Sequence, residues 1–498
     1  MSNGGNVSAS AALPTGLQTA IIVGAGASGL CTAIKLKQQG IDKFVILELS
    51  DGVGGTWRDN SYPGSGCDVP SHLYSFSFEP NPNWTRRFSR QPEILDYFEF
   101  VADKYKLRPH IVTNTRVDEA RYDAENSTWK VTTDKGDVVE GRFLISGTGQ
   151  LNRPFVPEIE GTDSFAGTAF HSARWNHDHD LTGKNIAVIG NGASAIQFVP
   201  EIVPKAANVT IFQRSANWIV EKPDRSYPAW ERALYKYVKP LLWLSRQRIF
   251  YAFEMRFSSF KQGTWLNKVA DKAAREHMEE ELKTDEARAL HIPDYPIGCK
   301  RVLISNDYLA AVQEPHVKVN TSGVAKIEAD AIIGNDGQRH EIDTLIYSTG
   351  FKTSEFISPM KVVGVDGIDL NAAWKEGAEA HQGITVAGFP NFFMAYGPNT
   401  NLGHNSIIFM VECQVRYIMN CLNMVLARDL KALDVKREAM SAYNTRLQNA
   451  LGDTIWAAGC DSWYKNDAGK IVNNWSGYAL GYRKETRKLS WDDYQLIA

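Results

Sequence analysis

The feature that most constrains the fold is a pair of glycine-rich turns, each placed between a short apolar run and a helical pattern. The first, Gly24-Ala-Gly-Ala-Ser-Gly29, follows the apolar run 20–23, and the second, Gly190-Asn-Gly-Ala-Ser-Ala195, follows the run 185–189. Such apolar runs predict strands of a buried parallel sheet. A strand, a glycine turn and a helix in this order bind phosphate, because the helix N-terminus offers N–H donors. We therefore predict an α/β protein with two Rossmann-type dinucleotide-binding domains.

The first turn has the features of a site for an adenosine ribose. Gly24 is expected to make the tight turn, Gly26 to let the backbone approach a pyrophosphate, and Gly29 to let the helix pack closely on the strand. The next predicted strand, 44–48, ends in Glu48, 24 positions after Gly24. A carboxylate there accepts hydrogen bonds from ribose hydroxyls and repels a 2′-phosphate. The first site is therefore predicted to hold FAD or NAD.

The second turn carries the opposite charge at the corresponding position. The same 24 positions counted from Gly190 lead to Arg214, at the end of the predicted strand 209–214. A guanidinium binds a 2′-phosphate through charge-assisted hydrogen bonds. Because the internal repeat fixes the register, we interpret Arg214 as a coenzyme contact and not as a solvated charge at a strand end. The second site is predicted to prefer NADPH to NADH.

Two further motifs resemble those of a known family. The first has spaced positions at Phe165, Gly167, His171 and Trp175. The second is the loop 54–68, which contains Gly-Gly-x-Trp and Tyr-Pro-Gly and ends in Asp68. Both resemble signatures of the type I Baeyer-Villiger monooxygenases, flavoenzymes that use NADPH and oxygen to turn ketones into esters or lactones. Asn176 departs from the pattern, since that family usually has Pro or Asp after the Trp.

The resemblance implies FAD in the first site, NADPH in the second, and a ketone or sulfide with O2 as substrates. It also implies that Arg301 is a fixed cation that keeps a flavin peroxide anionic, with Asp68 as its carboxylate partner. The implied FAD contacts are Gly24, Gly26, Ser28, Gly29, Glu48, Gly55, Thr56, Trp57, Asp68, Tyr74 and Val117. The implied NADP contacts are Gly66, Cys67, Asp68, Gly190, Gly192, Ala193, Ser194, Ala195, Gln197, Arg214, Ser215, Lys300, Arg301 and Trp463.

Other interpretations of these residues stay open. A flavin-containing N- or S-oxygenating monooxygenase shares the two-site layout but usually has Tyr or another residue where Trp175 stands. His171 and Trp175 could also be a buried, hydrogen-bonded pair that stiffens a linker, and Trp463 an ordinary core residue. A flavin disulfide reductase would need two cysteines at short spacing. The six cysteines, which we expect to be free thiols in a cytoplasmic protein, are Cys31, Cys67, Cys299, Cys413, Cys421 and Cys460.

The positions of the motifs predict the domain organisation, since 498 residues exceed one ordinary core. The expected parts are a disordered tail at 1–17, an FAD domain at 18–152 and 385–498, an NADPH domain at 153–224 and 293–384, and a helical insertion at 225–292. The insertion is predicted because helix formers dominate it and Gly263 is its only glycine. The loop 397–405 is expected to approach the flavin.

Charge and hydropathy limit the partners. A net charge of −3 gives no general attraction to nucleic acid, and no metal-binding cluster stands out. The most apolar helical stretch, 235–257, is interrupted by Lys and Arg, so we expect no transmembrane helix. This basic and aromatic stretch could lie on a membrane surface, but we expect it to pack its apolar face on the protein. A monomer is expected.

Overall fold

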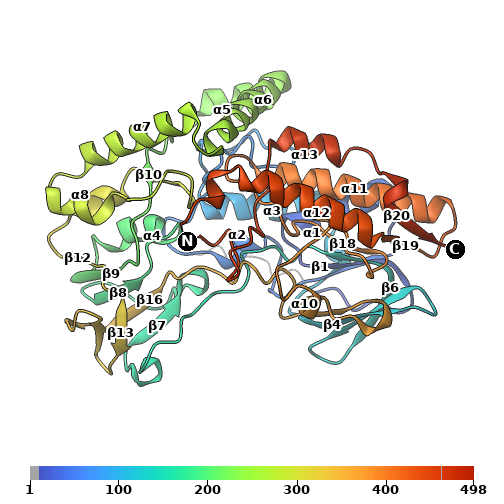
Figure 1. The fold of residues 1–498 in the computed structure, drawn as a ribbon, viewed down its shortest axis with the longest axis horizontal. Coiled ribbons are helices and arrows are strands. Elements are labelled where there is room, and N and C mark those ends of the chain that lie inside the picture. The colour runs from blue at the N-terminus through green and yellow to red at the C-terminus, as the bar shows by residue number, and fades with distance from the viewer. Residues whose placement is uncertain (1–9, 461) are drawn as a thin grey trace.

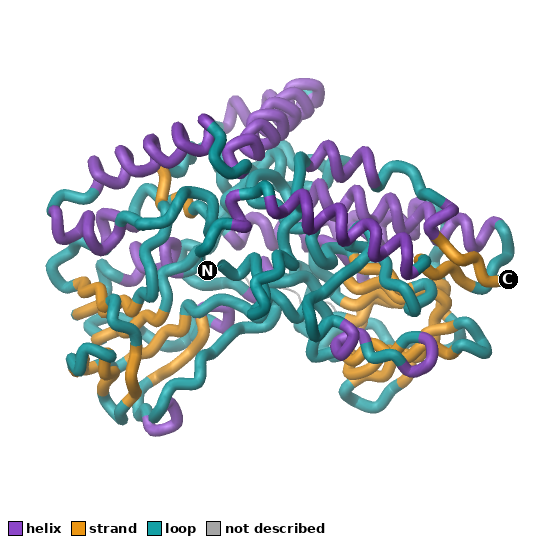
Figure 2. The backbone as a smooth tube through the Cα atoms, in the orientation of Figure 1, coloured by secondary structure: helices purple, strands orange, loops and turns teal. Residues whose placement is uncertain are grey.

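The structure is a computed structural model that describes residues 10–460 and 462–498. Two groups of strands lie side by side, and a set of helices extends across the top of both (Figure 1). Figure 2 shows that most helices lie on this upper side and that loops fill the region between the two groups of strands. The predicted α/β class with two dinucleotide-binding domains is confirmed, since the chain forms two separate large sheets, one mixed and one fully parallel.

The predicted FAD domain is built on an eight-stranded sheet with the order β17-β4-β5-β6-β1-β2-β3, in which β18 also pairs with β6. Its strands are β1 (Gln18–Val23), β2 (Phe44–Leu47), β3 (Ile111–Val112), β4 (Val117–Asp123), β5 (Thr128–Thr133), β6 (Val138–Ser146), β17 (Lys361–Val363) and β18 (Phe392–Met394). Pairing is parallel around β1 and antiparallel along β4, β5 and β6. The parallel part carries the first glycine turn at its carboxyl edge.

Helices α1 (Ala27–Gln38) and α11 (Ile407–Ala427) pack together over this sheet. Leu30 and Ile34 of α1 meet Ile418 and Leu422 of α11 in one apolar core with the strand residue Ile22. The remaining elements of this half are α2 (Thr56–Asp59), α3 (Gln91–Lys104), α10 (Leu370–Ala373), α12 (Arg437–Gly452), α13 (Ala479–Glu485), β19 (Ala432–Val435) and β20 (Tyr494–Ile497).

The predicted NADPH domain has a fully parallel sheet with the order β12-β9-β8-β16-β7. Its elements are β7 (Thr168–His171), β8 (Asn185–Ile189), α4 (Ala195–Ile202), β9 (Asn208–Phe212), α9 (Tyr308–Ala311), β12 (Val317–Asn320) and β16 (Thr344–Tyr347). An antiparallel sheet of β13 (Val324–Ile327), β14 (Ala331–Gly334) and β15 (Arg339–Glu341) packs against it. Strand β8 has the bounds that the sequence predicts.

The predicted insertion is helical, with α5 (Ala229–Tyr237), α6 (Lys239–Met255), α7 (Trp265–Glu281) and α8 (Asp285–His291). The short parallel strands β10 (Ile219–Val220) and β11 (Leu303–Ile304) pair where the chain leaves and re-enters the domain. Ala274 and Met278 of α7 are buried against the NADPH domain. Within the described residues, no helix is long and apolar enough to cross a membrane.

Two expected boundaries were wrong. The FAD domain resumes before residue 385, because β17 pairs with β4 and because Ile357 and Met360 lie in the FAD-domain core. A three-residue edge strand has too little periodicity to be recognised in a sequence. The expected tail also ends earlier: the N–H of Ala11 donates to the carbonyl of Ile111 at 3.0 Å, and Leu13 packs on the same core. Residues 1–9 of that expected tail lie outside the described residues.

Candidate active site

A cavity of about 1600 Å³ lies where the two sheets and the helical insertion meet. Both glycine turns open on it, and so do Glu48 after β2, Arg214 after β9, and Arg301 just before β11. The two turns follow the carboxyl ends of parallel strands, the edge at which α/β sheets bind ligands. Two nucleotide sites that were predicted separately from the sequence therefore share one space.

The first glycine turn needs its glycines for different reasons. Gly24 has φ +100, and a Cβ there would lie 2.7 Å from the carbonyl oxygen of Gly147. Gly26 faces the cavity, and a Cβ on Gly26 would have the Cα of Gly55 as its nearest neighbour, at 3.6 Å. A Cβ on Gly29 would lie 1.8 Å from the carbonyl oxygen of Gly24, so Gly29 allows α1 to pack on β1 and does not line the cavity. This turn fits a pyrophosphate that approaches along the backbone.

Glu48 lies at the end of β2 with only 6% of its surface exposed. Its Oε2 accepts the N–H of Ala25 at 2.5 Å and its Oε1 accepts the N–H of Ser50 at 2.7 Å. Burial raises the pKa of Glu48, while these two N–H donors oppose that rise. A carboxylate can accept about four hydrogen bonds, so two acceptor positions remain for ribose hydroxyls.

The second site gathers polar and basic groups after β9. Arg214 is exposed toward the cavity, and the Nζ of Lys300 donates to the Oγ of Ser215 at 2.7 Å. The side chain of Asn191 holds this segment by donating to the carbonyl of Ser215 at 2.9 Å. A Cβ on Gly192 would meet nothing within 4 Å, which leaves the turn open for a phosphate. The arrangement fits a coenzyme with a 2′-phosphate.

The remaining expected contacts divide into those that line the cavity and those that do not. Ala195 is fully buried and, like Gly29, does not line it. Gly29 and Ala195 are the last residues of the two glycine-rich turns, where the helix packs on the strand. The expected contacts that line the cavity are Gly24, Gly26, Ser28, Glu48, Gly55, Thr56, Trp57, Gly66, Cys67, Asp68, Tyr74, Val117, Gly190, Gly192, Ala193, Ser194, Gln197, Arg214, Ser215, Lys300, Arg301 and Trp463.

Arg301 and Asp68 form an ion pair in the cavity, with 2.7 Å between Nη2 and Oδ2. Burial by itself would lower the pKa of Arg301, but the Asp68 carboxylate together with Tyr464 and Cys67 outweighs burial and raises it. The Arg301 side chain keeps 41% of its surface accessible, so the cation faces the cavity. The other carboxylate oxygen of Asp68, Oδ1, is buried and accepts no hydrogen bond from the described residues. A bound ligand that donates an N–H would satisfy it.

The long loop 54–68 crosses from the first domain to the second. The side chain of Gln197 in α4 donates to the carbonyl of Gly66 at 3.0 Å and accepts from the hydroxyl of Tyr62 at 3.0 Å. A Cβ on Gly64 would lie 2.2 Å from the carbonyl oxygen of Gln197. The loop therefore places Asp68 at a fixed position between the two nucleotide sites. This role explains why the loop 54–68 is so long.

His171 lies outside the cavity and connects two backbone segments. Its Nδ1 accepts the N–H of Ala173 at 3.1 Å, so its Nε2 carries the proton and donates to the carbonyl of Gly350 at 3.1 Å. Burial lowers the pKa of His171 to about 4, which keeps the ring neutral at pH 7. Gly350 lies in the connection that returns the chain to the FAD domain.

The other three positions of this motif also stay out of the cavity. Trp175 packs against Phe170 and Phe198, with ring centroids 5.1 and 5.3 Å apart. A Cβ on Gly167 would lie 2.5 Å from the carbonyl oxygen of Asp343, and Phe165 packs in the core beside the small antiparallel sheet. The geometry favours the interpretation of His171 and Trp175 as residues that stiffen the connection between domains.

Part of the cavity wall carries no recognisable motif. Phe253 and Phe260 come from the insertion, and Tyr396 precedes the loop 397–405. Asn401 to Asn405 of that loop line the cavity. The glycine and proline residues of the loop 397–405 allowed its place at the site to be predicted from the sequence. The aromatic residues of the helical insertion could not be predicted as cavity residues, because in the sequence they look like ordinary core residues.

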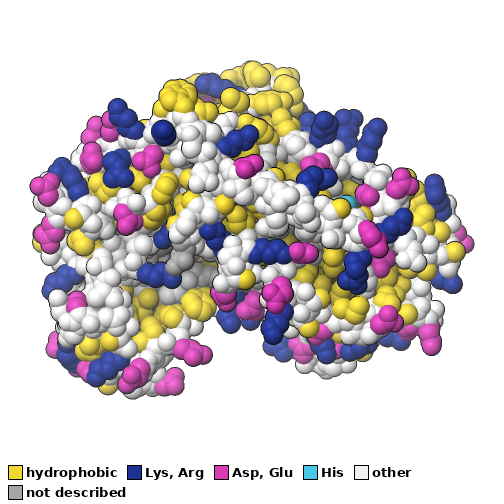
Figure 3. Space-filling view, in the orientation of Figure 1, with side chains coloured by type: hydrophobic (Ala, Val, Ile, Leu, Met, Phe, Trp, Pro, Cys, Tyr) yellow, Lys and Arg dark blue, Asp and Glu magenta, His cyan; other side chains and the backbone are white. Residues whose placement is uncertain are grey.

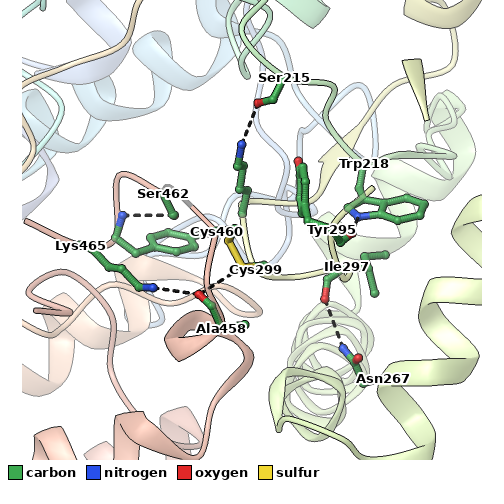
Figure 4. The surroundings of a disulfide bond; sticks show 12 residues. Ser215, Trp218, Asn267, Tyr295, Ile297, Cys299, Ala458, Cys460, Ser462 and Lys465 are labelled. Carbon is green, nitrogen blue, oxygen red and sulfur yellow. Dashed lines mark hydrogen bonds between the residues drawn. A yellow bond between two sulfur atoms is a disulfide. The ribbon is translucent and has the colours of Figure 1, made fainter. Parts of the chain in front are cut away.

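The expectation that all six cysteines are free thiols was wrong, because Cys299 and Cys460 form a disulfide across 161 residues (Figure 4). No spacing rule detects a pair that only the tertiary fold brings together. The bond joins the segment that carries Lys300 and Arg301 to the loop that carries Trp463. The Nζ of Lys465 also donates to the carbonyl of Ala458 at 2.9 Å. The C-terminal loop is thus attached beside the cation.

This disulfide predicts a defined thiol count. Unfolded but unreduced protein should show only Cys31, Cys67, Cys413 and Cys421 as reactive thiols, and reduction should add two more. Reduction should also lower the free energy of unfolding by about 2–4 kcal/mol and make 458–465 sensitive to protease. A Cys460→Ser variant serves as the control, because reductant should not change its unfolding midpoint. Six reactive thiols in unreduced protein would contradict the assignment.

Two dinucleotide sites that share a cavity, with a fixed cation between them, define a two-cofactor oxidoreductase. Residues 21–241 match the family described as pyridine nucleotide-disulphide oxidoreductase. A Baeyer-Villiger monooxygenase of Pseudomonas aeruginosa is 41% identical over 95% of this chain and 90% of its own length. One from Streptomyces coelicolor is 41% identical over 96% of this chain and 92% of its own length.

The fold agrees with these relatives. The NADP⁺-bound cyclohexanone monooxygenase of Rhodococcus sp. Phi1 has a TM-score of 0.89 at 26% identity, covering 97% of this chain and 100% of that one. An NADP-bound steroid monooxygenase has a TM-score of 0.86 at 27% identity, with the same coverage. The chain belongs to the Baeyer-Villiger monooxygenase family. It is an NADPH-dependent flavin monooxygenase with FAD and NADPH as cofactors, as expected, and the N- or S-oxygenating alternative is set aside.

Proposed function

We propose that Arg301 and Asp68 are the catalytic pair of this monooxygenase and that its substrate is a cyclic ketone, which it converts into a lactone. The observation that carries the proposal is the position of the Arg301 guanidinium, which faces the cavity between the two nucleotide sites. The names of the steroid and cyclohexanone monooxygenases support a cyclic substrate. Sulfides are a second substrate class that the same site would oxygenate.

The residues of the chain supply charge and position. FAD, when bound, activates oxygen, and NADPH supplies the electrons. Attack on a ketone carbonyl places negative charge on its oxygen, and a guanidinium stabilises that charge without titrating near neutral pH. Asp68 holds Arg301 by the 2.7 Å ion pair, and its second oxygen is available to position the coenzyme. The walls formed by Phe253, Phe260 and Leu402 exclude water and favour an apolar substrate.

The substrate proposal is tested with a panel of cyclic ketones, open-chain ketones and sulfides. Each compound is supplied with NADPH and oxygen, NADPH consumption is followed by absorbance, and products are identified by gas chromatography with mass spectrometry. The proposal predicts lactones from cyclic ketones with consumption of one NADPH for each product. If only sulfides or open-chain ketones gave oxygenated products, the cyclic-ketone assignment would be rejected.

Substitution of Arg214 is predicted to change the preference of the enzyme for NADPH over NADH. Arg214→Ala should weaken NADPH binding and leave NADH binding almost unchanged, because only NADPH carries the 2′-phosphate. A hydrogen bond to a charged group is worth about 1.5–3 kcal/mol, so the preference should fall roughly tenfold to a hundredfold. The measurement is kcat/KM for both coenzymes. Arg288→Ala, which removes an arginine outside the cavity, should keep the preference. Equal use of both coenzymes by the unmodified enzyme would refute the role of Arg214.

We also propose that the enzyme works as a cytoplasmic monomer. One chain supplies residues to both halves of the cavity, which supports a monomer. Regeneration of NADPH in the cytoplasm supports this location, where the Cys299–Cys460 disulfide would have to persist in a reducing compartment. Light scattering of the purified protein and fractionation of cells test these two statements.

A further inference from the structure

Helix α6 has apolar residues on two of its faces, one buried against the protein with Leu242, Phe250 and Phe253 and one exposed to solvent. Trp243, Leu244, Tyr251 and Met255 lie on one helical face and are 62, 56, 54 and 69% exposed. Arg246 lies on the opposite face and is 7% exposed. The sequence-based expectation that this stretch packs an apolar face on the protein holds for Leu242, Phe250 and Phe253, and the exposed apolar face is an additional feature that was not predicted.

The buried polar groups fix this orientation of the helix. The Nη1 of Arg246 donates to the carbonyls of His72 and Ser75, each at 3.0 Å. Glu254 is 4% exposed and accepts the side-chain amide of Asn405 at 2.8 Å, and it also accepts the N–H of Leu480 at 2.8 Å. Rotating the helix to bury Trp243 would break these bonds and leave both charges without partners in the interior. The exposed apolar face is thus a stable feature of the fold.

The apolar surface continues onto the neighbouring helices. Trp230 and Tyr237 of α5 are 68 and 78% exposed, and Trp265 at the start of α7 is 72% exposed. In Figure 3, hydrophobic side chains gather at the top of the molecule, where Figure 1 places α5 and α6. We call this surface, made of Trp230, Tyr237, Trp243, Leu244, Tyr251, Met255 and Trp265, the aromatic face. Large exposed apolar side chains gathered on neighbouring helices mark an interaction site.

The exposed charges of the segment 229–270, which carries the aromatic face, have one sign. Residues 229–270 are all described, and every exposed charged side chain among them is basic, although the whole chain has a net charge of −3. These side chains are Lys236, Lys239, Arg248, Arg256, Lys261 and Lys268. The two acidic residues of this segment, Glu231 and Glu254, are buried.

We propose that the aromatic face docks the enzyme on the surface of a bilayer that contains anionic phospholipid. Trp and Tyr favour the boundary between headgroups and acyl chains, and Lys and Arg beside them attract anionic headgroups. The helices lie on the bilayer, since none of the described helices is long and apolar enough to span it. A second copy of the chain fits less well, because a symmetric contact would bring the same basic side chains face to face.

The test is flotation of the FAD-loaded enzyme with vesicles of phosphatidylcholine alone or mixed with phosphatidylglycerol. The enzyme should float with the anionic vesicles and much less with the neutral ones. Lys236→Glu combined with Lys239→Glu should lower binding roughly tenfold or more, because each basic residue near the surface contributes about a fivefold factor. Trp243→Ser combined with Tyr251→Ser should lower it as well.

Phe100→Ser removes a 51% exposed aromatic residue from α3 and is the matched control, which should still float. Oxidation of NADPH with a water-soluble ketone should be the same in all variants, which shows that each is folded. The proposal is overturned if the enzyme does not bind anionic vesicles at low salt, or if the variants bind as well as the Phe100→Ser control. A concentration-dependent dimer that Trp243→Ser abolishes would also overturn it, since the face would then be an interface between copies.

Discussion

Arg301→Ala is expected to remove ester or lactone formation while the enzyme continues to bind FAD and NADPH. The alanine removes the fixed charge that faces the cavity and leaves Asp68 as an unpaired carboxylate. Loss of one preorganised charge contact in an active site costs about 3–4 kcal/mol, so oxygenated product should fall roughly a hundredfold or more. NADPH that is still oxidised should appear as hydrogen peroxide. The measurement is the ratio of product and of peroxide to NADPH consumed.

Two controls separate this effect from general damage. Lys300→Ala changes the neighbouring residue, whose Nζ bonds to Ser215 on the coenzyme side, and should weaken NADPH binding without releasing peroxide. Arg301→Lys keeps a positive charge without the guanidinium geometry and should recover part of the product. An Arg301→Ala enzyme that makes product at the normal ratio to NADPH would remove Arg301 from the reaction.

Among glycine-to-alanine substitutions in the FAD domain, Gly29→Ala is expected to destabilise the protein most. The new Cβ would lie 1.8 Å from the backbone carbonyl oxygen of Gly24, at the place where α1 packs on β1. To relieve this clash, α1 must move away from the sheet. This shift should lower the free energy of unfolding by roughly 3 kcal/mol and distort the pyrophosphate turn. Thermal unfolding and the ratio of bound FAD to protein measure the two effects.

Gly192→Ala is the matched substitution in the second turn. Its Cβ would have nothing within 4 Å, so the unfolding midpoint should stay close to that of the unmodified protein. The methyl group would point into the coenzyme site, and the KM for NADPH should rise. If Gly29→Ala and Gly192→Ala lowered the unfolding midpoint equally, the predicted difference in packing between the two glycine turns would be contradicted.

The sequence predicted what depends on local order along the chain. The strand, glycine turn and helix patterns placed β1, β8, α1 and α4, and the repeat of 24 positions related Arg214 to Glu48. These features are readable because the turn chemistry and the strand period are local. The ion pair between Arg301 and Asp68 was expected only from the family resemblance, since 233 positions separate the two residues.

The sequence could not predict what depends on distant contacts. The Cys299–Cys460 disulfide joins residues 161 positions apart, and β17 is recognisable only through its pairing with β4. The exposed apolar face of α6 was not predicted, because α6 has apolar residues on two faces and the sequence does not show which of them faces solvent. The bonds of Arg246 with the FAD-domain loop and those of Glu254 with Asn405 and Leu480 fix which face is buried.

The most direct test of the catalytic account supplies a cyclic ketone, NADPH and isotopically heavy oxygen gas to the purified enzyme, followed by mass spectrometry of the product. The account predicts a lactone with one heavy oxygen atom from the unmodified enzyme and almost none from Arg301→Ala. A product without the heavy atom, or labelled lactone in equal yield from Arg301→Ala, would contradict it.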